Sequence, residues 1–343
     1  MPALNFLLEQ ACPSIQYRLR REILGENPFA AHMQELQARV LLDPEVQRVA
    51  ASQQPDGWLG WNFHGENGVE AGVRLLREKG LEPSHLLLAR ALDALQAHPE
   101  RLARGIGKPG PWFDVLNLGG TQMIRAAVFA YAGAEERPGV QGQIEAALNG
   151  MDGVLAVQST AELVETRRGK NVLRAGVVWP SIYHLRLLAW TYSWRTANNL
   201  LRVQHAVERL VKLSPIPAFN VITHGQLVAP ASFAMQDFNS RLADLSEVGW
   251  MLWFHRVELL ARLGMIRRVP ALMRQVNELA AMLTEGNGFF TRRLSHPCFH
   301  APDTYGGLRL ETDWRASQRR VNDLTFRCIL VNFYSSAIQP IPG

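Results

Sequence analysis

The segment FHGENGVE, residues 63–70, places a histidine and two glutamates directly before a stretch with helical periodicity. His64 and Glu70 are candidate catalytic residues, because imidazole and carboxylate groups are common general acids and bases. Glu66 and Glu70 are four residues apart, so they share a helix face if the helix begins early enough. The alternative is structural, since a glutamate near the positive end of a helix stabilises that helix without catalysis.

A second candidate pair, Tyr183 and His184, lies in the segment WPSIYHLRLLAWTYSW. A tyrosine and a histidine can serve as the acid and base of a β-elimination. Adjacent residues on a helix diverge by about 100°, so we expect one of the two to face a cavity and the other to pack. The alternative is an ordinary core histidine.

The segment 306–327 alternates in charge ahead of a very apolar helix; it contains Glu311, Asp313, Arg315, Arg319, Asp323 and Arg327. Charges that enter a buried helix must be paired or used in a site. We predict a catalytic role for Asp313 and Arg315 and a substrate-binding role for Arg319. A buried ion-pair network with a purely structural role is the alternative.

Two loop carboxylates and one loop with metal-binding residue types complete the polar candidates. Asp114 and Asp237 lie between aromatic residues, which would raise the pKa of a carboxyl group, although each could instead cap a turn. His296, Cys298 and His300 alternate along the chain, so an extended segment would direct all three to one zinc ion. An ordinary loop is the alternative there. We expect no other cofactor, because the nucleotide-binding motifs are absent.

Tryptophans recur near the predicted helix starts. Trp58 and Trp61 are expected to pack between neighbouring helical hairpins, and Trp58 is also a candidate binding residue. Trp112, Trp179 and Trp250 would line a cavity suited to a hydrophobic or sugar ligand. Packing in the core explains these aromatic residues equally well.

The elements that must position these residues read almost entirely as helices. Six inner helices are predicted to begin near Ser14, Gly68, Gly120, Pro180, Glu247 and Gln318. Partner helices are predicted within 27–52, 84–98, 139–155, 196–213 and 267–283, with 2–11 as the sixth partner. Such a drifting repeat of hairpins predicts one α/α toroid domain over 1–343, with six inner and six outer helices. Only NVLRAGVVW, residues 171–179, is considered for a strand.

The predicted connections differ in length in a way that indicates where a site would lie. Connections from an inner helix to its partner are short, whereas those that return to the next inner helix are long, and long loops in compact domains are commonly functional. In a toroid the long loops meet at the end where the inner helices begin. Helix N-termini attract anions, so we expect an anionic group on the ligand.

The segment VQRVAASQQPDGWLG resembles the glutamine-tryptophan repeat of the terpenoid cyclase and protein prenyltransferase superfamily, through Gln53 or Gln54, Gly57 and Trp58. Weaker copies occur at Gly110 with Trp112 and at Gly288 with Phe289. The resemblance implies an α/α toroid in which the glutamine caps a helix and the tryptophan stacks on it. The acidic and metal-binding motifs of that superfamily are absent, so its chemistry is not carried over. The same fold includes polysaccharide lyases and glycoside hydrolases.

Composition agrees with an ordinary globular protein. The 343 residues are 47% hydrophobic and 20% charged, and no apolar run reaches the roughly 20 residues of a membrane span. The first residues lack the order of a secretory signal, and three scattered cysteines suit a reducing compartment, so a cytoplasmic protein is expected. The net charge of +5 comes without a nucleic-acid-binding motif, so nucleic acid is not an expected partner.

Three functions remain open at this point. The leading hypothesis is a cofactor-independent acid–base enzyme, of isomerase, lyase or cyclase type, acting on a hydrophobic or terpenoid-like small molecule. The first alternative is a glycan-acid lyase or glycoside hydrolase of the toroid type, and the second is a non-catalytic module that binds a peptide or lipid. If the six catalytic candidates line one pocket, catalysis is favoured; if they lie in separate ion pairs, the binding or structural alternative is favoured.

Overall fold

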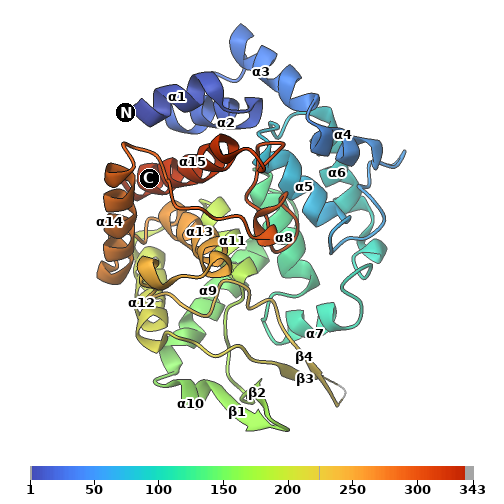
Figure 1. The fold of residues 1–343 in the computed structure, drawn as a ribbon. Helices are drawn as coiled ribbons and strands as arrows, with labels where there is room; N and C mark the ends of the chain where they lie inside the picture. Colours follow the sequence, from blue (N-terminus) through green and yellow to red (C-terminus); the bar gives the residue numbers. More distant parts are fainter. Residues whose placement is uncertain (1, 224, 337–343) are drawn as a thin grey trace. The chain divides into compact units, whose positions relative to one another are not determined.

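A computed structural model describes residues 2–223 and 225–336, and these residues are mostly helical (Figure 1), with 56% in helices and 5% in strands. A helix is present at each of the six positions where an inner helix is predicted. These helices are α2 (Pro13–Arg18), α5 (Val69–Glu78), α8 (Thr121–Tyr131), α11 (Ile182–Trp190), α13 (Glu247–Arg262) and α15 (Ser317–Ser336). A π-helical turn, Leu19–Ile23, continues α2.

The predicted partner helices are also confirmed. They are α1 (Pro2–Gln10), α3 (Ala31–Leu41) with α4 (Pro44–Ala51), α6 (Leu86–Ala97), α9 (Val140–Ala156), α12 (Ala197–Leu213) and α14 (Pro270–Glu285). The first partner is split because Pro44 starts a new helix whose N-cap is Asp43, which accepts from the N–H groups of Glu45 and Val46 at 2.9 and 3.4 Å.

Several short elements occupy the long connections. They are α7 (Pro109–Val115), α10 (Thr160–Leu163) and the 3₁₀ turns Pro99–Arg101, Leu242–Asp244 and Pro297–Phe299. Two antiparallel hairpins pair β1 (Val164–Arg167) with β2 (Lys170–Leu173) and β3 (Val221–Thr223) with β4 (Gln226–Val228). The expected strand at 171–179 is confirmed only for its first three residues. Arg168 and Gly169 both have positive φ, which suits the two-residue turn of the first hairpin.

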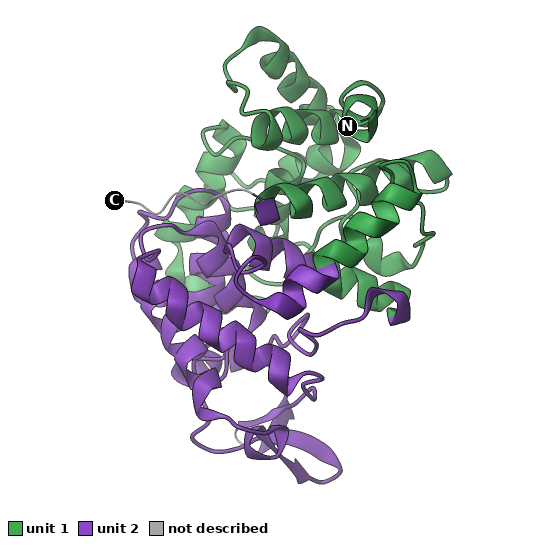
Figure 2. Ribbon diagram, turned by 90° about the vertical axis from the view of Figure 1, so that its left-hand side faces the viewer, with its two compact units in different colours: residues 1–105, 245–254, 276–334 green, residues 106–244, 255–275, 335–343 purple. Residues whose placement is uncertain are grey.

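The chain divides into two compact units (Figure 2), and the division falls inside α13 and α14. Unit 1 contains residues 1–105, 245–254 and 276–334, and unit 2 contains residues 106–244, 255–275 and 335–343. The prediction of one closed toroid domain over 1–343 stays a prediction. No helix in the described part of the chain is long and apolar enough to cross a membrane.

In unit 1, one apolar cluster joins α1, α2 and α15. It consists of Leu7, Ala11, Ile15, Leu19, Leu310, Phe326, Ile329 and Leu330. The cluster therefore brings together segments from both ends of the described sequence. In unit 2, α8 packs on α11 and α9 packs on α12. The guanidinium group of buried Arg195 donates to the carbonyls of Ala189, Thr191 and Arg262, where it satisfies the open end of α11.

The glutamine-tryptophan segment forms a joint between α4 and α6 in unit 1. Gln53 Nε2 donates to the carbonyls of Gly57 and Leu87 at 3.0 and 2.8 Å, and Trp58 is fully buried. Gly57 has φ +95°, and a Cβ there would lie 2.4 Å from the carbonyl oxygen of Arg90. The expected packing of Trp58 is confirmed.

The prediction that Trp61 packs between neighbouring helical hairpins is wrong. Trp61 is 68% exposed, and the Arg104 guanidinium lies 4.8 Å from its ring centroid. The difference from Trp58 follows from the backbone, because Gly60 has φ +62° and the chain turns there. Trp61 is thereby placed on the surface.

Buried charges fasten the segment 308–311 to α5 in unit 1. The fully buried Lys79 ammonium lies 2.8 Å from Asp43 Oδ2, 2.9 Å from Glu45 Oε2 and 2.8 Å from the carbonyl oxygen of Leu310. Burial alone would lower the pKa of Lys79, but the charges of Glu45 and Asp43 outweigh it and raise the pKa. The ammonium group is therefore charged and paired inside the protein.

A second buried group of charges lies one residue earlier on α5. Glu78 Oε2 accepts from Arg18 Nη1 at 2.7 Å and from Arg327 Nη2 at 2.8 Å. Arg327 also donates to the Leu308 carbonyl at 2.9 Å. Glu78, the last residue of α5, and Lys79, its C-cap, thus fix the segment 308–311 at Leu308, through Arg327, and at Leu310.

Replacing Lys79 by Met should lower the free energy of unfolding by about 3 kcal/mol, because Asp43 and Glu45 would lose their buried counter-charge. Chemical denaturation followed by circular dichroism measures the change. Arg309→Met is the control: this arginine pairs with Glu45 in a partly exposed position, and its loss should cost about 1 kcal/mol or less. Equal losses for the two variants would contradict a special contribution of the buried ammonium.

Candidate functional site

His64 lies between a carboxylate and a phenol in unit 1. His64 Nδ1 is 2.7 Å from Glu70 Oε2, and His64 Nε2 is 2.7 Å from Tyr305 Oη. His64 is 9% exposed and Glu70 is buried, whereas Tyr305 is 38% exposed. The row of three side chains therefore runs from the interior to the surface.

The loop before α5 holds His64 by its backbone. The N–H groups of Phe63 and His64 donate to the Arg104 carbonyl at 3.1 and 3.2 Å, and Glu70 N–H donates to the Phe63 carbonyl at 3.1 Å. A Cβ at Gly105 would lie 1.9 Å from the His64 carbonyl oxygen, so this close approach requires glycine. Glu70, in the first turn of α5, then faces the imidazole.

Arg74, one turn after Glu70 on α5, fixes the loop that carries Tyr305. Its guanidinium group donates to the carbonyls of Asp303, Gly306 and Gly307. Asp303 Oδ1 accepts from the N–H of Tyr305 at 2.8 Å, which closes a turn at the loop tip. Helix α5 therefore positions both the imidazole and the phenol.

The donors and acceptors of this row define a proton path. When Glu70 is ionised and the imidazole is neutral, the imidazole proton lies on Nδ1, because a carboxylate only accepts hydrogen bonds. Nε2 is then the acceptor for the Tyr305 hydroxyl. The same order of carboxylate, imidazole and hydroxyl activates the nucleophile of serine hydrolases, although here the hydroxyl is a phenol.

His184 and Tyr183 have a different environment, in unit 2. His184 is fully buried, Nδ1 accepts from the Ser181 N–H at 3.0 Å, and Nε2 is 3.1 Å from Asn117 Oδ1. Burial lowers the pKa of His184 to about 3. The histidine closes the capping box of α11, and Tyr183 is also buried. Both side chains are thus buried, and His184 has the structural role expected as the alternative.

The charged segment 306–327 separates into a surface pair and a buried network, both in unit 1. Asp313 and Arg315 pair with each other at 3.1 Å, and the Arg315 side chain is 93% exposed. Arg319 donates to Thr312 Oγ1 at 3.0 Å in an exposed position. Asp323, by contrast, is fully buried and accepts from the N–H groups of Leu310 and Glu311. Asp323 is thus held by hydrogen bonds, and a buried ion pair of this segment is the one between Arg327 and Glu78.

Both carboxylates expected in loops accept backbone N–H groups, although Asp114 lies in α7 and caps α8. Asp114 accepts from the N–H of Gln122, in the first turn of α8, at 3.0 Å, and burial raises its pKa. Asp237 accepts from the N–H of Asn239 at 2.9 Å and from Ser240 Oγ at 2.7 Å. These are the structural roles expected as alternatives.

The tryptophan candidates divide between core and cavity. Trp58, Trp179 and Trp250 are buried, and Trp250 packs in unit 1 against the ring of Phe290 at 5.2 Å between ring centroids. Trp112 lines a separate cavity of about 290 Å³ in unit 2 beside β1, β2 and β3. Trp112 therefore lies at a cavity, whereas the other three tryptophan candidates are buried.

The loop proposed for zinc forms a 3₁₀ turn instead of an extended segment. His296 Nδ1 accepts from the Cys298 N–H at 3.1 Å, which directs the imidazole back to the backbone. Burial and Glu247 raise the pKa of Cys298 to about 11. Within residues 2–223 and 225–336, no three His, Cys, Asp or Glu side chains, including those of His296, Cys298 and His300, are placed to hold one metal ion.

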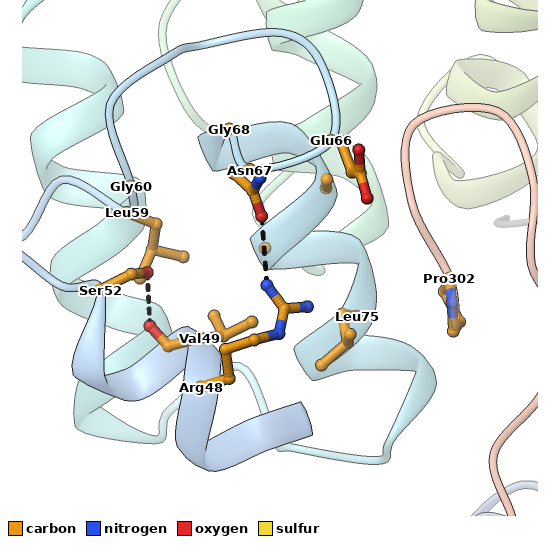
Figure 3. Close-up of a pocket in the computed structure, with 12 residues that line it drawn as sticks. Arg48, Val49, Ser52, Leu59, Gly60, Glu66, Asn67, Gly68, Leu75 and Pro302 are labelled. Carbon is orange, nitrogen blue, oxygen red and sulfur yellow. Dashed lines mark hydrogen bonds between the residues drawn. The ribbon is translucent and has the colours of Figure 1, made fainter. Parts of the chain in front are cut away.

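A cavity of about 290 Å³ lies beside the His64 loop in unit 1 (Figure 3). It is enclosed by α4, the loop before α5, α5 itself and Pro302 of the Tyr305 loop. Glu66 lines this cavity. Because α5 begins at Val69, Glu66 lies in the loop and does not share a helix face with Glu70.

The helix N-termini offer less to an anion than expected. The first N–H groups of α5 donate to the carbonyls of Asn62 and Phe63, and those of α8 and α11 bind Asp114 and Ser181. These caps use the same donors that would bind an anionic ligand.

Comparisons with protein-family models, with curated proteins and with solved structures find no match. The functional argument therefore depends on the residues themselves. Sequence reasoning selected His64 and Glu70 and missed Arg74 and Tyr305. The signal for Tyr305 was its place in APDTYGG, where Asp303 and two glycines indicate a tight turn.

Replacing Arg74 by Met should speed hydrogen exchange at Tyr305, Gly306 and Gly307 about tenfold, because the loop would lose the guanidinium group that binds its carbonyls. Exchange measured by mass spectrometry on peptides covering 300–310 tests this. Arg77→Met is the control on the same helix, since Arg77 donates to Leu81 instead. An unchanged exchange rate in Arg74→Met would show that the Tyr305 loop keeps its conformation without the Arg74 guanidinium group.

Replacing His184 by Gln should make the free energy of unfolding depend less on pH between pH 7 and pH 5. The folded pKa of about 3 lies below the unfolded value, so the wild type binds a proton only on unfolding as the pH falls below about 6.5. Its stability should therefore fall by about 2 kcal/mol more than that of the variant between pH 7 and pH 5. Urea denaturation at both pH values measures the difference. A constant difference would mean that His184 is protonated within the fold.

Proposed function

We propose that the chain is a cofactor-independent acid–base enzyme in which Tyr305 exchanges a proton with the substrate. The observation that carries this proposal is the row Glu70–His64–Tyr305, with two contacts of 2.7 Å and its phenol at the surface. In the basic direction, the phenol oxygen takes a proton from a substrate carbon while its own proton moves to His64 Nε2. Glu70 stabilises the imidazolium that forms, and the reverse sequence protonates the substrate.

Burial and fixed geometry support this role. A buried carboxylate beside a largely buried imidazole costs free energy unless the two are paired, and pairing favours one tautomer and one ring orientation. Arg74 restricts the phenol through three backbone carbonyls. Such preorganisation reduces the rearrangement that proton transfer requires.

The substrate that we favour is a hydrophobic, terpenoid-like small molecule, which the enzyme isomerises, cyclises or converts by elimination. The capped N-termini of α5, α8 and α11 remove one reason to expect an anionic group on the substrate. An α/α toroid and a cytoplasmic location belong to this proposal. The alternating helical hairpins support the toroid, and three free thiols support a reducing compartment.

One observation favours a second candidate, a non-catalytic binding module. Of the six residues first considered catalytic, only His64 and Glu70 contact each other in a row that reaches a further polar group. His184 serves as a cap, and Asp313 and Arg315 form an exposed ion pair. A protein that binds a ligand without changing it would need no more than this.

Incubation of the protein with a metabolite extract in deuterated water separates the two candidates. We expect the wild type to convert at least one apolar metabolite, with deuterium in the product, as mass spectrometry would detect. Tyr305→Phe and His64→Gln should slow that conversion at least ~100-fold, the usual contribution of a general acid or base. Tyr305→Phe removes one oxygen from a partly exposed side chain, so its fold should remain intact.

Tyr192→Phe is the matched control, because Tyr192 is an exposed tyrosine of unit 2 and should leave turnover unchanged. A metabolite that is retained but recovered without deuterium or mass change, equally in all four proteins, would support the binding module and exclude the enzyme.

A further inference from the structure

We propose that the cavity between α4 and α5 binds a free apolar α-amino acid of about the size of leucine. The cavity has a volume of about 290 Å³, which lies at the small end of ligand pockets. An apolar cavity of about half this volume holds benzene, so a leucine or phenylalanine side chain fits while a peptide or a long isoprenoid does not.

The floor of the cavity is apolar. Val49, Leu59, Leu75 and Pro302 line it (Figure 3), together with the backbone of Gly60 and several other small residues. Burial of an aliphatic side chain there would remove apolar surface from water on both partners. Apolar character alone would accept any small hydrocarbon, so the choice of ligand depends on the rim.

The rim carries two opposite charges that do not pair with each other. Arg48 donates to Asn67 Oδ1 at 3.2 Å, and it makes no ion pair with a carboxylate in the described part of the chain. The Glu66 carboxylate has neither a hydrogen bond nor an ion pair with residues 2–223 or 225–336. One cavity thus presents a guanidinium group and a carboxylate that both lack a counter-charge.

This charge pattern matches a zwitterion. The ligand carboxylate would lie at Arg48, where charge-assisted hydrogen bonds form, and the ligand ammonium would lie at Glu66. A simple fatty acid would bring a second carboxylate to Glu66, and a simple amine would bring a second cation to Arg48. The rim therefore discriminates against both and favours a molecule that carries the two charges together.

Gly72 keeps the cavity open from the side of α5. A Cβ at this position would lie 3.0 Å from Leu59 Cδ1 and 3.4 Å from Val49 Cγ1, so a methyl group would press on two side chains of the floor. The flexible end of Leu59 can move aside, which makes Gly72→Ala a mild way to reduce the cavity.

The proposal goes beyond the proton-transfer function and does not rest on it, because it uses none of Glu70, His64 or Tyr305. If both hold, Tyr305→Phe slows turnover at least ~100-fold and still binds the amino acid as the wild type does. The two ideas can therefore fail separately.

Isothermal titration calorimetry with four small probes tests the proposal on the full chain. L-Leucine should bind about tenfold more tightly than 4-methylpentanoate, 3-methylbutylamine or glycine, which lack the ammonium, the carboxylate and the side chain respectively. Arg48→Gln and Glu66→Gln should each weaken leucine binding about tenfold. Gly72→Ala should weaken leucine binding while leaving the weak binding of glycine unchanged.

The two charge variants also have opposite expected effects on the simpler probes. Glu66→Gln should bind 4-methylpentanoate at least as well as the wild type does, and Arg48→Gln should do the same for 3-methylbutylamine. Both residues are exposed, so equal melting temperatures would show that the fold is kept. The proposal is overturned if leucine binds no better than glycine, or if either charge variant binds leucine as the wild type does. It is also overturned if 4-methylpentanoate binds as tightly as leucine, since the cavity would then be a site for apolar acids.

Discussion

The buried ammonium group of Lys79 is the constraint on which the candidate site depends. It joins the carboxylates of Asp43 and Glu45 to the carbonyl of Leu310, and so ties α4 and α5 to the segment that follows the Tyr305 loop. A charge without water must have its partners in place, so this segment has little freedom to move. The C-terminal end of the Tyr305 loop, which directly precedes this segment, is therefore held in place.

Helix α5 combines three functions on one face through residues four apart. Glu70 orients His64, Arg74 binds the Tyr305 loop, and Glu78 pairs with Arg18 and Arg327. Positions separated by four residues lie above one another on a helix, so a single rigid element sets the imidazole, the loop and the supporting charges in register. This arrangement explains why a ten-residue helix contains so many buried polar side chains.

Helical periodicity was sufficient to place the long helices, because amphipathic faces and capping residues leave a strong local signal, but it missed the short helices α7 and α10. The same reasoning found His64 and Glu70, which are close in sequence, and missed Tyr305, which meets His64 across 241 residues. Contacts of that range leave no local pattern. The strands were mostly missed because they are three or four residues long. The role of His184 could be read only in part from its neighbours, since Ser181 is three residues away but Asn117, which contacts Nε2, is 67 residues away.

The apolar cluster of α1, α2 and α15 has a consequence for the growing polypeptide. Leu7, Ile15 and Leu19 pack against Phe326 and Leu330, which are translated some three hundred residues later. At ordinary rates of synthesis this interval lasts about 15 to 60 seconds. During that time α2 can already pack against α3, but the apolar side chains of Leu7, Ile15 and Leu19 that contact α15 stay exposed to water and are available to chaperones.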